Sequence, residues 1–347
     1  MAFGLGRLIS YSTEIKNGKG PISALYIDSQ FPRPVSHGSQ ALVKIVAFGL
    51  NRMDLLQREG NYPMPPQAPK TMGVEFSGTV VSLPTDPPAD HRPERCFKVG
   101  DEVFGLVYGG AYAEYIAVST HMLVHKPKEL SWAEAAGIPE TWITAVQALY
   151  LVGCYQPGES VLWHAGASSV SIAGIQLARA DGASAVYVTA SSQDKIDFCR
   201  SVGATQGFNY REGNWAEMLL KETAGKGVDV IVDFIGASYL DQNLDAAARD
   251  GRLVCLGALG GNVFKGELNL SRILQKRLRI QGSMLRNRDE AYQSRLRDML
   301  VERALPGFVD GRFKVIIDRV FKMDQIQEAH ELLESNTTKG KIICMVD

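Results

Sequence analysis

The sequence has 347 residues, and its 37 basic and 38 acidic side chains give a formal net charge of -1. Hydrophobic residues make up 45% and charged residues 22%, a balance typical of a globular protein of one or two domains with a sizeable core. This even charge, without long runs of one sign, argues against nucleic acid or an anionic membrane as the main partner. No stretch reaches the roughly 18 apolar residues that a membrane-spanning helix needs.

The cysteines show no CxxC pair and no spacing typical of a disulfide framework, which indicates a reducing compartment. They stand at Cys96, Cys154, Cys199, Cys255 and Cys344. A strand is already predicted at residues 8–11, which leaves little room for a cleaved leader peptide. We therefore expect a cytoplasmic protein.

Residues 1 to about 138 contain short apolar segments broken by Gly and Pro, a texture typical of antiparallel or barrel-like strands. The segments are 41–50, 78–83, 101–107 and 112–118. The Pro-rich, polar stretch 84–98 is predicted to be a surface insertion between strands and not a domain linker.

From Trp132 onward, apolar strands alternate with helical segments, which favours a parallel, doubly wound sheet. The predicted strands are 161–164, 185–190, 228–234, 252–256 and 278–282, and the predicted helices are 170–179, 194–202, 215–223, 239–248 and 270–276. After about residue 287 the pattern changes again, with helices at 288–303 and 324–334 and strands at 315–320 and 342–346. An α/β part therefore interrupts a β-rich part.

The most informative stretch runs from residue 161 to 177, where a strand enters a turn of small residues and leaves as an amphipathic helix. That is the context of a dinucleotide-binding turn, in which backbone N–H groups and the positive end of a helix face a pyrophosphate. Read as GxGxxG, Gly166 holds the first position, while Ser168 and Ser171 replace the second and third glycines. A serine hydroxyl can donate to a phosphate oxygen, so we expect a working site of altered affinity. The alternative is an ordinary tight turn between strand and helix.

The next strand-to-helix turn ends at Ser191 and Ser192 and contains no acidic residue to bond the ribose 2′-hydroxyl of NAD. Lys195 follows in the first turn of the next helix and suits the 2′-phosphate of NADPH, although a solvated surface lysine is the alternative interpretation. Asp194 is interpreted as a helix-start residue. This turn therefore favours NADPH over NADH.

Taken together, these features resemble the zinc-free quinone oxidoreductases of the medium-chain dehydrogenase/reductase superfamily, especially the stress-inducible quinone oxidoreductase subgroup. The resemblance covers nearly the whole chain, because many matches occur in the same order. They lie at 47–54, 57–63, 73–78, 99–103, 138–145, 161–177, 208–210 and 340–342. Ser169 and Ser171 stand where most relatives have glycine, a departure that bears on cofactor affinity more than on fold.

The resemblance implies an α/β protein in which a Rossmann doubly wound parallel sheet is inserted in a discontinuous GroES-like β-barrel domain. The catalytic GroES-like domain would comprise residues 1–138 and 287–347, and the NADPH-binding Rossmann domain residues 139–286. A cleft between the two domains would take the nicotinamide and the acceptor, with Asn51 and Asp54 on the nicotinamide side. The expected cofactor contacts are Thr144, Gly166, Ser168, Ser169, Val170, Ser191, Ser192, Lys195, Tyr210, Gly236, Leu259, Met284 and Asn336.

Zinc alcohol dehydrogenases of this superfamily carry a Cys in the stretch matching 49–51 and a His in the stretch matching 73–75. This chain has Asn51 and Val74 there. A structural zinc site needs four closely placed thiolates, and Cys96 stands alone. His121 and His125 lie in a segment that reads as loop and strand, where residues four apart do not share a face. We therefore expect no metal.

Without zinc to polarise an alcohol, the hydride acceptor has to be activated already. A quinone accepts hydride into a conjugated system and leaves a delocalised anion that water can protonate, while the protein supplies orientation and electrostatics. We therefore predict hydride transfer from NADPH to a quinone or another activated enone.

Tyr62 is the strongest catalytic candidate, because it follows the helix-like segment 53–58. It either donates a proton or hydrogen bond to the substrate carbonyl or forms an aromatic wall of the pocket. Asn51 either bonds the cofactor or substrate or serves as a turn amide. Glu75 is interpreted as a structural residue at the start of a buried strand, and His164 as a packing histidine.

Two other functions remain open at this point. A 2-enoyl-thioester reductase would need a proton donor, and the Tyr62–Pro63 context resembles the tyrosine that such relatives use. A non-enzymatic NADPH-binding protein is the second, motivated by the serines in the turn. A homodimer is also expected, because relatives pair their Rossmann sheets edge to edge and the apolar stretch 254–259 could supply that edge.

Overall fold

The computed structural model describes residues 5–11, 20–84 and 93–346, so part of the predicted 84–98 insertion, residues 85–92, lies outside the described residues. The chain divides into two compact units. The antiparallel unit comprises residues 1–143 and 286–347, and the parallel unit comprises residues 144–285. Residues 139–143, expected in the Rossmann domain, belong to the antiparallel unit.

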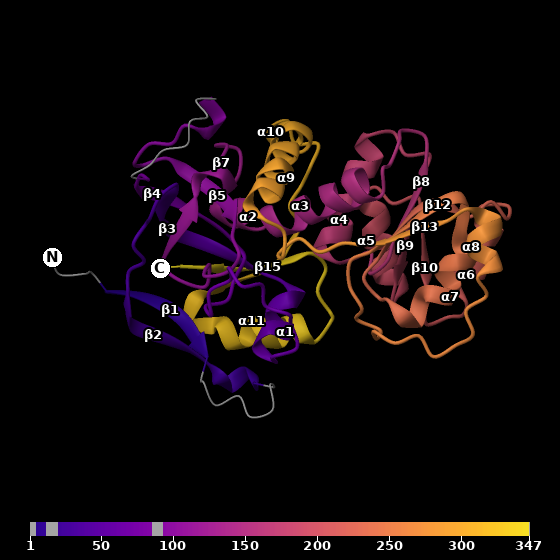
Figure 1. Ribbon diagram of the computed structural model, residues 1–347, viewed down its shortest axis with the longest axis horizontal. Coiled ribbons are helices and arrows are strands. Elements are labelled where there is room, and N and C mark those ends of the chain that lie inside the picture. The colour runs from indigo at the N-terminus through magenta and orange to yellow at the C-terminus, as the bar shows by residue number, and fades with distance from the viewer. Residues whose placement is uncertain (1–4, 12–19, 85–92, 347) are drawn as a thin grey trace. The chain divides into compact units, whose positions relative to one another are not determined.

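The antiparallel unit is built on a seven-stranded sheet in its described ranges. The sheet order is β14(Ile317–Lys322), β15(Lys341–Met345), β3(Gln40–Leu50), β4(Glu75–Ser82), β5(Glu102–Leu106) and β7(Leu123–His125), with β6(Tyr115–Ser119) paired to β3. Its pairs are antiparallel except β14 with β15. A two-stranded ribbon of β1(Leu5–Tyr11) with β2(Leu25–Pro32) is the other sheet in the described part of this unit (Figure 1).

The helices of the antiparallel unit come from both ends of the chain. They are α1(Arg52–Arg58), α2(Trp132–Ala136), α9(Glu290–Arg303), α10(Leu305–Val309) and α11(Ile326–Glu334), while α3(Pro139–Val146) spans the boundary at residue 143. The C-terminal segment joins the unit because β15 pairs with β3 and α11 packs against β15, β3 and α1. The unit is therefore discontinuous in sequence.

The parallel unit, every residue of which is described, contains one six-stranded sheet. The strand order is β10(Gln206–Asn209), β9(Ala185–Ala190), β8(Ser160–Trp163), β11(Val228–Asp233), β12(Ala247–Cys255) and β13(Arg279–Gly282), and every neighbouring pair is parallel. The connecting helices are α4(Ser169–Ala180), α5(Gln193–Ser201), α6(Trp215–Glu222), α7(Leu240–Ala246) and α8(Ser271–Lys276) (Figure 1). This is the order of a doubly wound nucleotide-binding sheet.

A buried apolar cluster joins α6 and α7 to one face of the parallel sheet. Trp215 and Leu219 of α6 pack with Leu162, Ile231 and Leu253, which come from three neighbouring strands. The alternation of apolar strands and helices therefore predicts this unit correctly, because the inner strands β8, β9, β11 and β12 are largely buried beneath the crossover helices.

Several predicted boundaries and pairings are wrong for identifiable reasons. The strand expected at 112–118 begins only at Tyr115, since Gly110 has a φ of 95° and the chain turns there. Strand β10 is missing from the predicted strands, because Gln206-Gly207-Phe208-Asn209 is short and polar. The stretch 254–259 is not a free sheet edge, because β12 pairs with both β11 and β13. The free edge on that side of the fully described parallel unit is β13.

Candidate functional site

Most of the predicted cofactor residues gather at one edge of the parallel sheet. Because all its strands run in the same direction, the turns that follow them lie at a common edge. Backbone hydrogen bonds join neighbouring turns there: Gly166 N–H donates to Thr189 O at 2.9 Å, and Tyr210 N–H to Ala190 O at 3.2 Å. The predicted positions that follow strands are Gly166 and Ser168 after β8, Ser191 and Ser192 after β9, Tyr210 after β10, Gly236 after β11, Leu259 after β12 and Met284 after β13.

The strand order reverses between β8 and β11, since the chain runs from β8 to β9 and β10 on one side and then crosses to β11 on the other. Such a switch point opens a crevice at the carboxyl ends of the two central strands, which is where ligands bind in this class of sheet. The turn that the sequence predicts to bind phosphate follows β8 directly, so it lies at the position of this crevice.

The turn after β8 begins α4 with its own serine cap. Ser168 Oγ accepts from Ser171 N–H at 3.3 Å and donates to Ser171 Oγ at 3.0 Å. The buried Ser171 hydroxyl in turn donates to His164 O at 2.8 Å. The serines that replace glycine in GxGxxG therefore stabilise the turn through hydrogen bonds within it. Ser169 and Val170 lie half-buried in the first turn of the helix.

Two glycines allow the close approaches that this turn requires. A Cβ built on Gly166 would lie 2.7 Å from the Cβ of Val188, and one on Gly174 would lie 2.0 Å from the Trp163 ring. Close packing of helix on strand is the role of the third glycine in the usual fingerprint. Here Gly174 has that role, and sequence reasoning missed it; the signal was a bulky Trp163 at the end of the strand that α4 covers.

His164 is the centre of a buried hydrogen-bonded chain behind the turn. Its ring nitrogens lie 2.8 Å from Thr189 Oγ1 and 2.7 Å from Asn243 Oδ1, and burial lowers its pKa. Asn243 Nδ2 donates to Asp233 at 3.1 Å, and Asp233 accepts from the backbone N–H of Gly236 at 3.2 Å. The interpretation of His164 as a packing histidine is confirmed. This chain of hydrogen bonds also fixes the turn after β11, where Gly236 has a φ of 82°.

The turn after β9 starts α5 with Ser192 as its cap, whose Oγ accepts from Lys195 N–H at 3.3 Å. Lys195 is half-buried in the first helical turn, and Asp194 is an exposed first-turn residue as expected. Tyr210 is 39% exposed, and its ring centroid lies 6.3 Å from that of Tyr239. Hydroxyl, ammonium and phenol groups therefore belong to adjacent turns of the same edge.

The remaining predicted cofactor residues are more dispersed. Thr144 is half-buried in α3, while Leu259 and Met284 expose 53% and 37% of their surface. Asn336 belongs to the antiparallel unit, where it has a φ of 56° and its side-chain oxygen accepts from Arg52. It is therefore not part of the sheet edge that carries the others.

The antiparallel unit contains a buried ion pair that orients Asn51. Lys341 forms an ion pair with Glu75, and both side chains are at most 1% exposed. Asn51 Nδ2 donates to Glu75 at 2.8 Å, and Lys341 Nζ donates to Asn51 Oδ1 at 2.7 Å. The second Glu75 oxygen accepts from Glu140 N–H at 2.9 Å. The structural interpretation of Glu75 is confirmed, and sequence reasoning missed its partner Lys341.

Asp54 is a wholly buried carboxyl at the start of α1. Its Oδ2 accepts from Asn51 N–H at 2.8 Å and from the Tyr112 hydroxyl at 3.0 Å, while Oδ1 has no hydrogen-bond partner in the described ranges. Burial raises the pKa of Asp54 to about 6 against the opposing effect of these donors. Asp54 is therefore the N3 carboxylate of a capping box at the start of α1, in which Asn51 is the N-cap residue.

Tyr62 lies beside the guanidinium of Arg286, whose central carbon is 5.3 Å from the tyrosine ring centroid. Arg286 is itself fixed, because Nε donates to Tyr108 O at 2.6 Å and Nη1 to Gln57 Oε1 at 2.9 Å. Burial, followed by Glu140, raises the pKa of Tyr62 to about 12, although Arg286 opposes the rise. Tyr62 is thus a neutral phenol at physiological pH. Arg286 was missed by sequence reasoning because it is about 220 residues away along the chain.

Glu140, like Asp54, is a buried acid near this cluster with a raised pKa. Burial and then the charge of Glu75 raise the pKa of Glu140 to about 7. The antiparallel unit therefore contains one polar cluster, made up of Glu75, Lys341, Asn51, Asp54, Tyr62 and Arg286. Within the described ranges, no group of three or more His, Cys, Asp or Glu side chains is arranged to hold a metal ion.

Comparison with known proteins identifies the class. The model of the alcohol dehydrogenase GroES-like domain matches residues 37–128, and that of the zinc-binding dehydrogenase matches residues 169–302. The chain is 30% identical to bovine (Bos taurus) quinone oxidoreductase-like protein 2, over 92% of this chain and 88% of the relative. The chain therefore belongs to the medium-chain dehydrogenase/reductase superfamily, among its quinone oxidoreductase-like members.

Solved structures agree with this assignment. The quinone oxidoreductase of Pseudomonas syringae pv. Tomato DC3000 superposes with a TM-score of 0.84 at 26% identity, covering 98% of this chain and 99% of that one. The CurK enoyl reductase superposes with a TM-score of 0.81 at 26% identity, covering 99% of both chains. The protein is an oxidoreductase with a GroES-like domain and a Rossmann-like, pyridine-nucleotide-binding domain. No helix in the described residues has the length and apolar character to cross a membrane.

The raised pKa of Asp54 predicts how this carboxyl affects stability as pH changes. The folded state holds the proton up to about pH 6, whereas the unfolded chain releases it near pH 3.8. The stability that the protonated Asp54 carboxyl contributes to the folded state is therefore fully present below about pH 4 and is lost as pH rises toward 6. We expect the free energy of unfolding of Asp54→Asn, relative to wild type, to rise by roughly 3 kcal/mol between pH 4 and pH 7. Urea titrations at several pH values measure this difference, and a pH-independent difference would contradict it.

Proposed function

We propose that this protein is a zinc-independent oxidoreductase that uses NADPH to reduce a quinone or another activated enone. The observation that carries the proposal is the hydrogen bonding of Asn51, which stands where zinc-dependent relatives have a cysteine. Its carboxamide is held between Lys341 and Glu75, so the cluster offers an amide and an ion pair in place of a thiolate metal ligand. Without a Lewis acid to polarise an alcohol, the acceptor has to be activated by its own conjugation.

The proposed NADPH preference rests on the turn after β9. Ser191 and Ser192 offer hydroxyls, Lys195 follows in the first turn of α5, and Asp194 is a helix-start residue after the turn. A 2′-phosphate requires donors and positive charge, whereas a free 2′-hydroxyl is usually bonded by an acidic residue. NADPH, when bound, supplies the hydride. The start of α4 would hold its pyrophosphate through backbone N–H groups, while Gly166 lets the turn pack closely against Val188 of β9.

Tyr62 is the proposed donor to the acceptor carbonyl. With its pKa raised to about 12, the phenol keeps its proton and can donate a hydrogen bond to an oxygen on which negative charge develops. Arg286, fixed by Tyr108 and Gln57, positions Tyr62 and adds a positive charge beside it. The buried Asn51 is proposed as a positioning residue, because its side-chain oxygen is already occupied by Lys341.

A 2-enoyl-thioester reductase is the alternative within enzymes, and the likeness to the CurK enoyl reductase favours it. That reaction requires a proton at carbon after hydride addition, so it would depend more strongly on a phenolic donor than quinone reduction does. A non-enzymatic NADPH-binding protein is the other alternative. Its mark would be NADPH binding without turnover of any acceptor.

Steady-state NADPH oxidation with 9,10-phenanthrenequinone and with crotonyl-CoA tests these proposals. We expect the wild type to prefer the quinone, and Tyr62→Phe to lower its kcat/KM about tenfold, the worth of one lost hydrogen bond. Tyr26→Phe, at an exposed tyrosine of the same unit, should leave the rate unchanged. A preference for crotonyl-CoA with a loss of 100-fold or more in Tyr62→Phe would favour the thioester reductase. No turnover of either acceptor would contradict both.

We also propose a homodimer and a cytosolic location. The dimer would form at β13, which exposes Ile280 at the free edge of the parallel sheet; Leu274 of α8, the helix before β13 in the chain, is exposed as well. The location is supported by the cysteines, all of which are free thiols. Light scattering should give the mass of a dimer for the wild type and of a monomer for Ile280→Glu. A monomeric wild type would contradict the proposed dimer.

A further inference from the structure

A cavity lies in the antiparallel unit between the β1–β2 ribbon and β6. The ribbon is fixed by a bridge between Leu8 and Ala113 and by the Glu114 N–H, which donates to Arg7 O at 2.9 Å. An ion pair of 2.7 Å between Arg7 Nε and Glu114 Oε1 reinforces this contact. The walls of the cavity are therefore held by backbone pairing on one side and by the sheet on the other.

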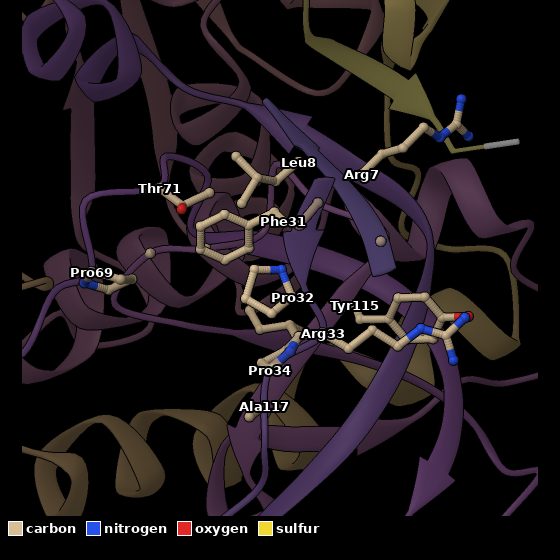
Figure 2. A pocket seen from close by; sticks show the side chains of 15 residues that line it. Arg7, Leu8, Phe31, Pro32, Arg33, Pro34, Pro69, Thr71, Tyr115 and Ala117 are labelled. Atoms are coloured by element: carbon tan, nitrogen blue, oxygen red, sulfur yellow. The ribbon is translucent and has the colours of Figure 1, made fainter. Parts of the chain in front are cut away.

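The cavity has a volume of about 240 Å³. Figure 2 shows Leu8, Phe31 and Pro32 around it, with Pro34 and Pro69 at its border. Pockets for drug-sized ligands usually measure about 300–1,000 Å³, so this one suits a smaller molecule. Phe31 exposes 45% of its surface here, which leaves an aromatic face open to an apolar ligand.

Arg33 is one of the polar side chains that line the cavity, together with Arg7 and Thr71. Its guanidinium lies 4.1 Å from the centroid of the Tyr115 ring, and Figure 2 shows the two side chains alongside each other. Within the described ranges no ion pair joins Arg33 to an acidic side chain, whereas the neighbouring Glu114 is already paired with Arg7. Stacking on an aromatic ring holds a guanidinium plane in place while leaving its N–H groups able to bind an oxyanion in a bidentate manner.

We propose that this cavity binds a small arylcarboxylate, with its ring against Phe31 and the prolines and its carboxylate on Arg33. Charge complementarity selects the anion, because Arg33 is a cation whose charge is not already neutralised by a carboxylate of the described residues. The apolar walls select a ring or compact hydrocarbon body. None of the residues proposed for NADPH or acceptor binding lines the cavity, so it is a separate site.

Ligand-observed ¹⁹F NMR with 4-fluorophenylacetate tests the proposal, with neutral 4-fluorophenylacetamide as the matched probe. We expect saturable binding of the acid, at least tenfold weaker binding of the amide, and at least tenfold weaker binding of the acid to Arg33→Gln. Arg319→Gln, at an exposed arginine on β14 of the same unit, should bind as the wild type does. NADPH oxidation by Arg33→Gln should stay at the wild-type rate, which separates this site from the proposed activity.

Phe31→Ser provides a second variant at an exposed position, and we expect it to weaken binding of the acid without changing the melting temperature. Equal affinities for acid and amide would overturn the assignment of the carboxylate to Arg33. Binding unchanged in both Arg33→Gln and Phe31→Ser, or no saturable binding to the wild type, would overturn the site itself.

Discussion

The parallel direction of all strands in the unit 144–285 is the constraint on which the candidate cofactor site depends. A parallel strand can follow another only after a crossover, so every connection returns the chain to the same starting edge and every next turn forms at the opposite edge. Residues separated by more than a hundred positions, such as Gly166 and Met284, therefore follow strands that end at one edge. Reversal of a single strand would move its turn to the other side of the sheet.

The antiparallel unit depends on a different kind of interaction, the buried pair of Lys341 and Glu75. Removing one member would leave an uncompensated buried charge, which typically costs about 3–5 kcal/mol. The pair joins β15, from the end of the chain, to β4, and it fixes the carboxamide of Asn51 at the start of α1. The same contact thus closes a unit that is discontinuous in sequence and orders the polar cluster around Tyr62.

Local patterns in the sequence were sufficient for the class of fold and for the strand–turn–helix geometry of residues 161–177. Strand and helix periodicity are properties of neighbouring residues, so α4, α5 and β9 were predicted within one or two residues of their observed bounds. The hydrogen bond of Ser171 could not be predicted in the same way, because the local pattern does not show that its hydroxyl donates to His164 O.

Features that depend on contacts between distant residues were not predictable from local patterns. The position of Arg286 beside Tyr62 follows from the return of the chain after residue 285, and the interior position of β12 follows from the later addition of β13. The role of Gly174 depends on the ring of Trp163 across the helix–strand contact. Each of these features depends on the tertiary structure. The large Trp163 and the small Gly174 are nevertheless complementary in size, which is a signal present in the sequence.

The edge formed after β8, β9 and β10 is proposed to be an NADPH site. The most direct test is a titration of the wild type and Lys195→Ala with NADPH and NADH, followed by nicotinamide fluorescence. We expect tighter binding of NADPH than of NADH to the wild type, and loss of that preference in the variant with NADH affinity retained. Equal affinities for both nucleotides in the wild type, or binding of neither, would contradict it.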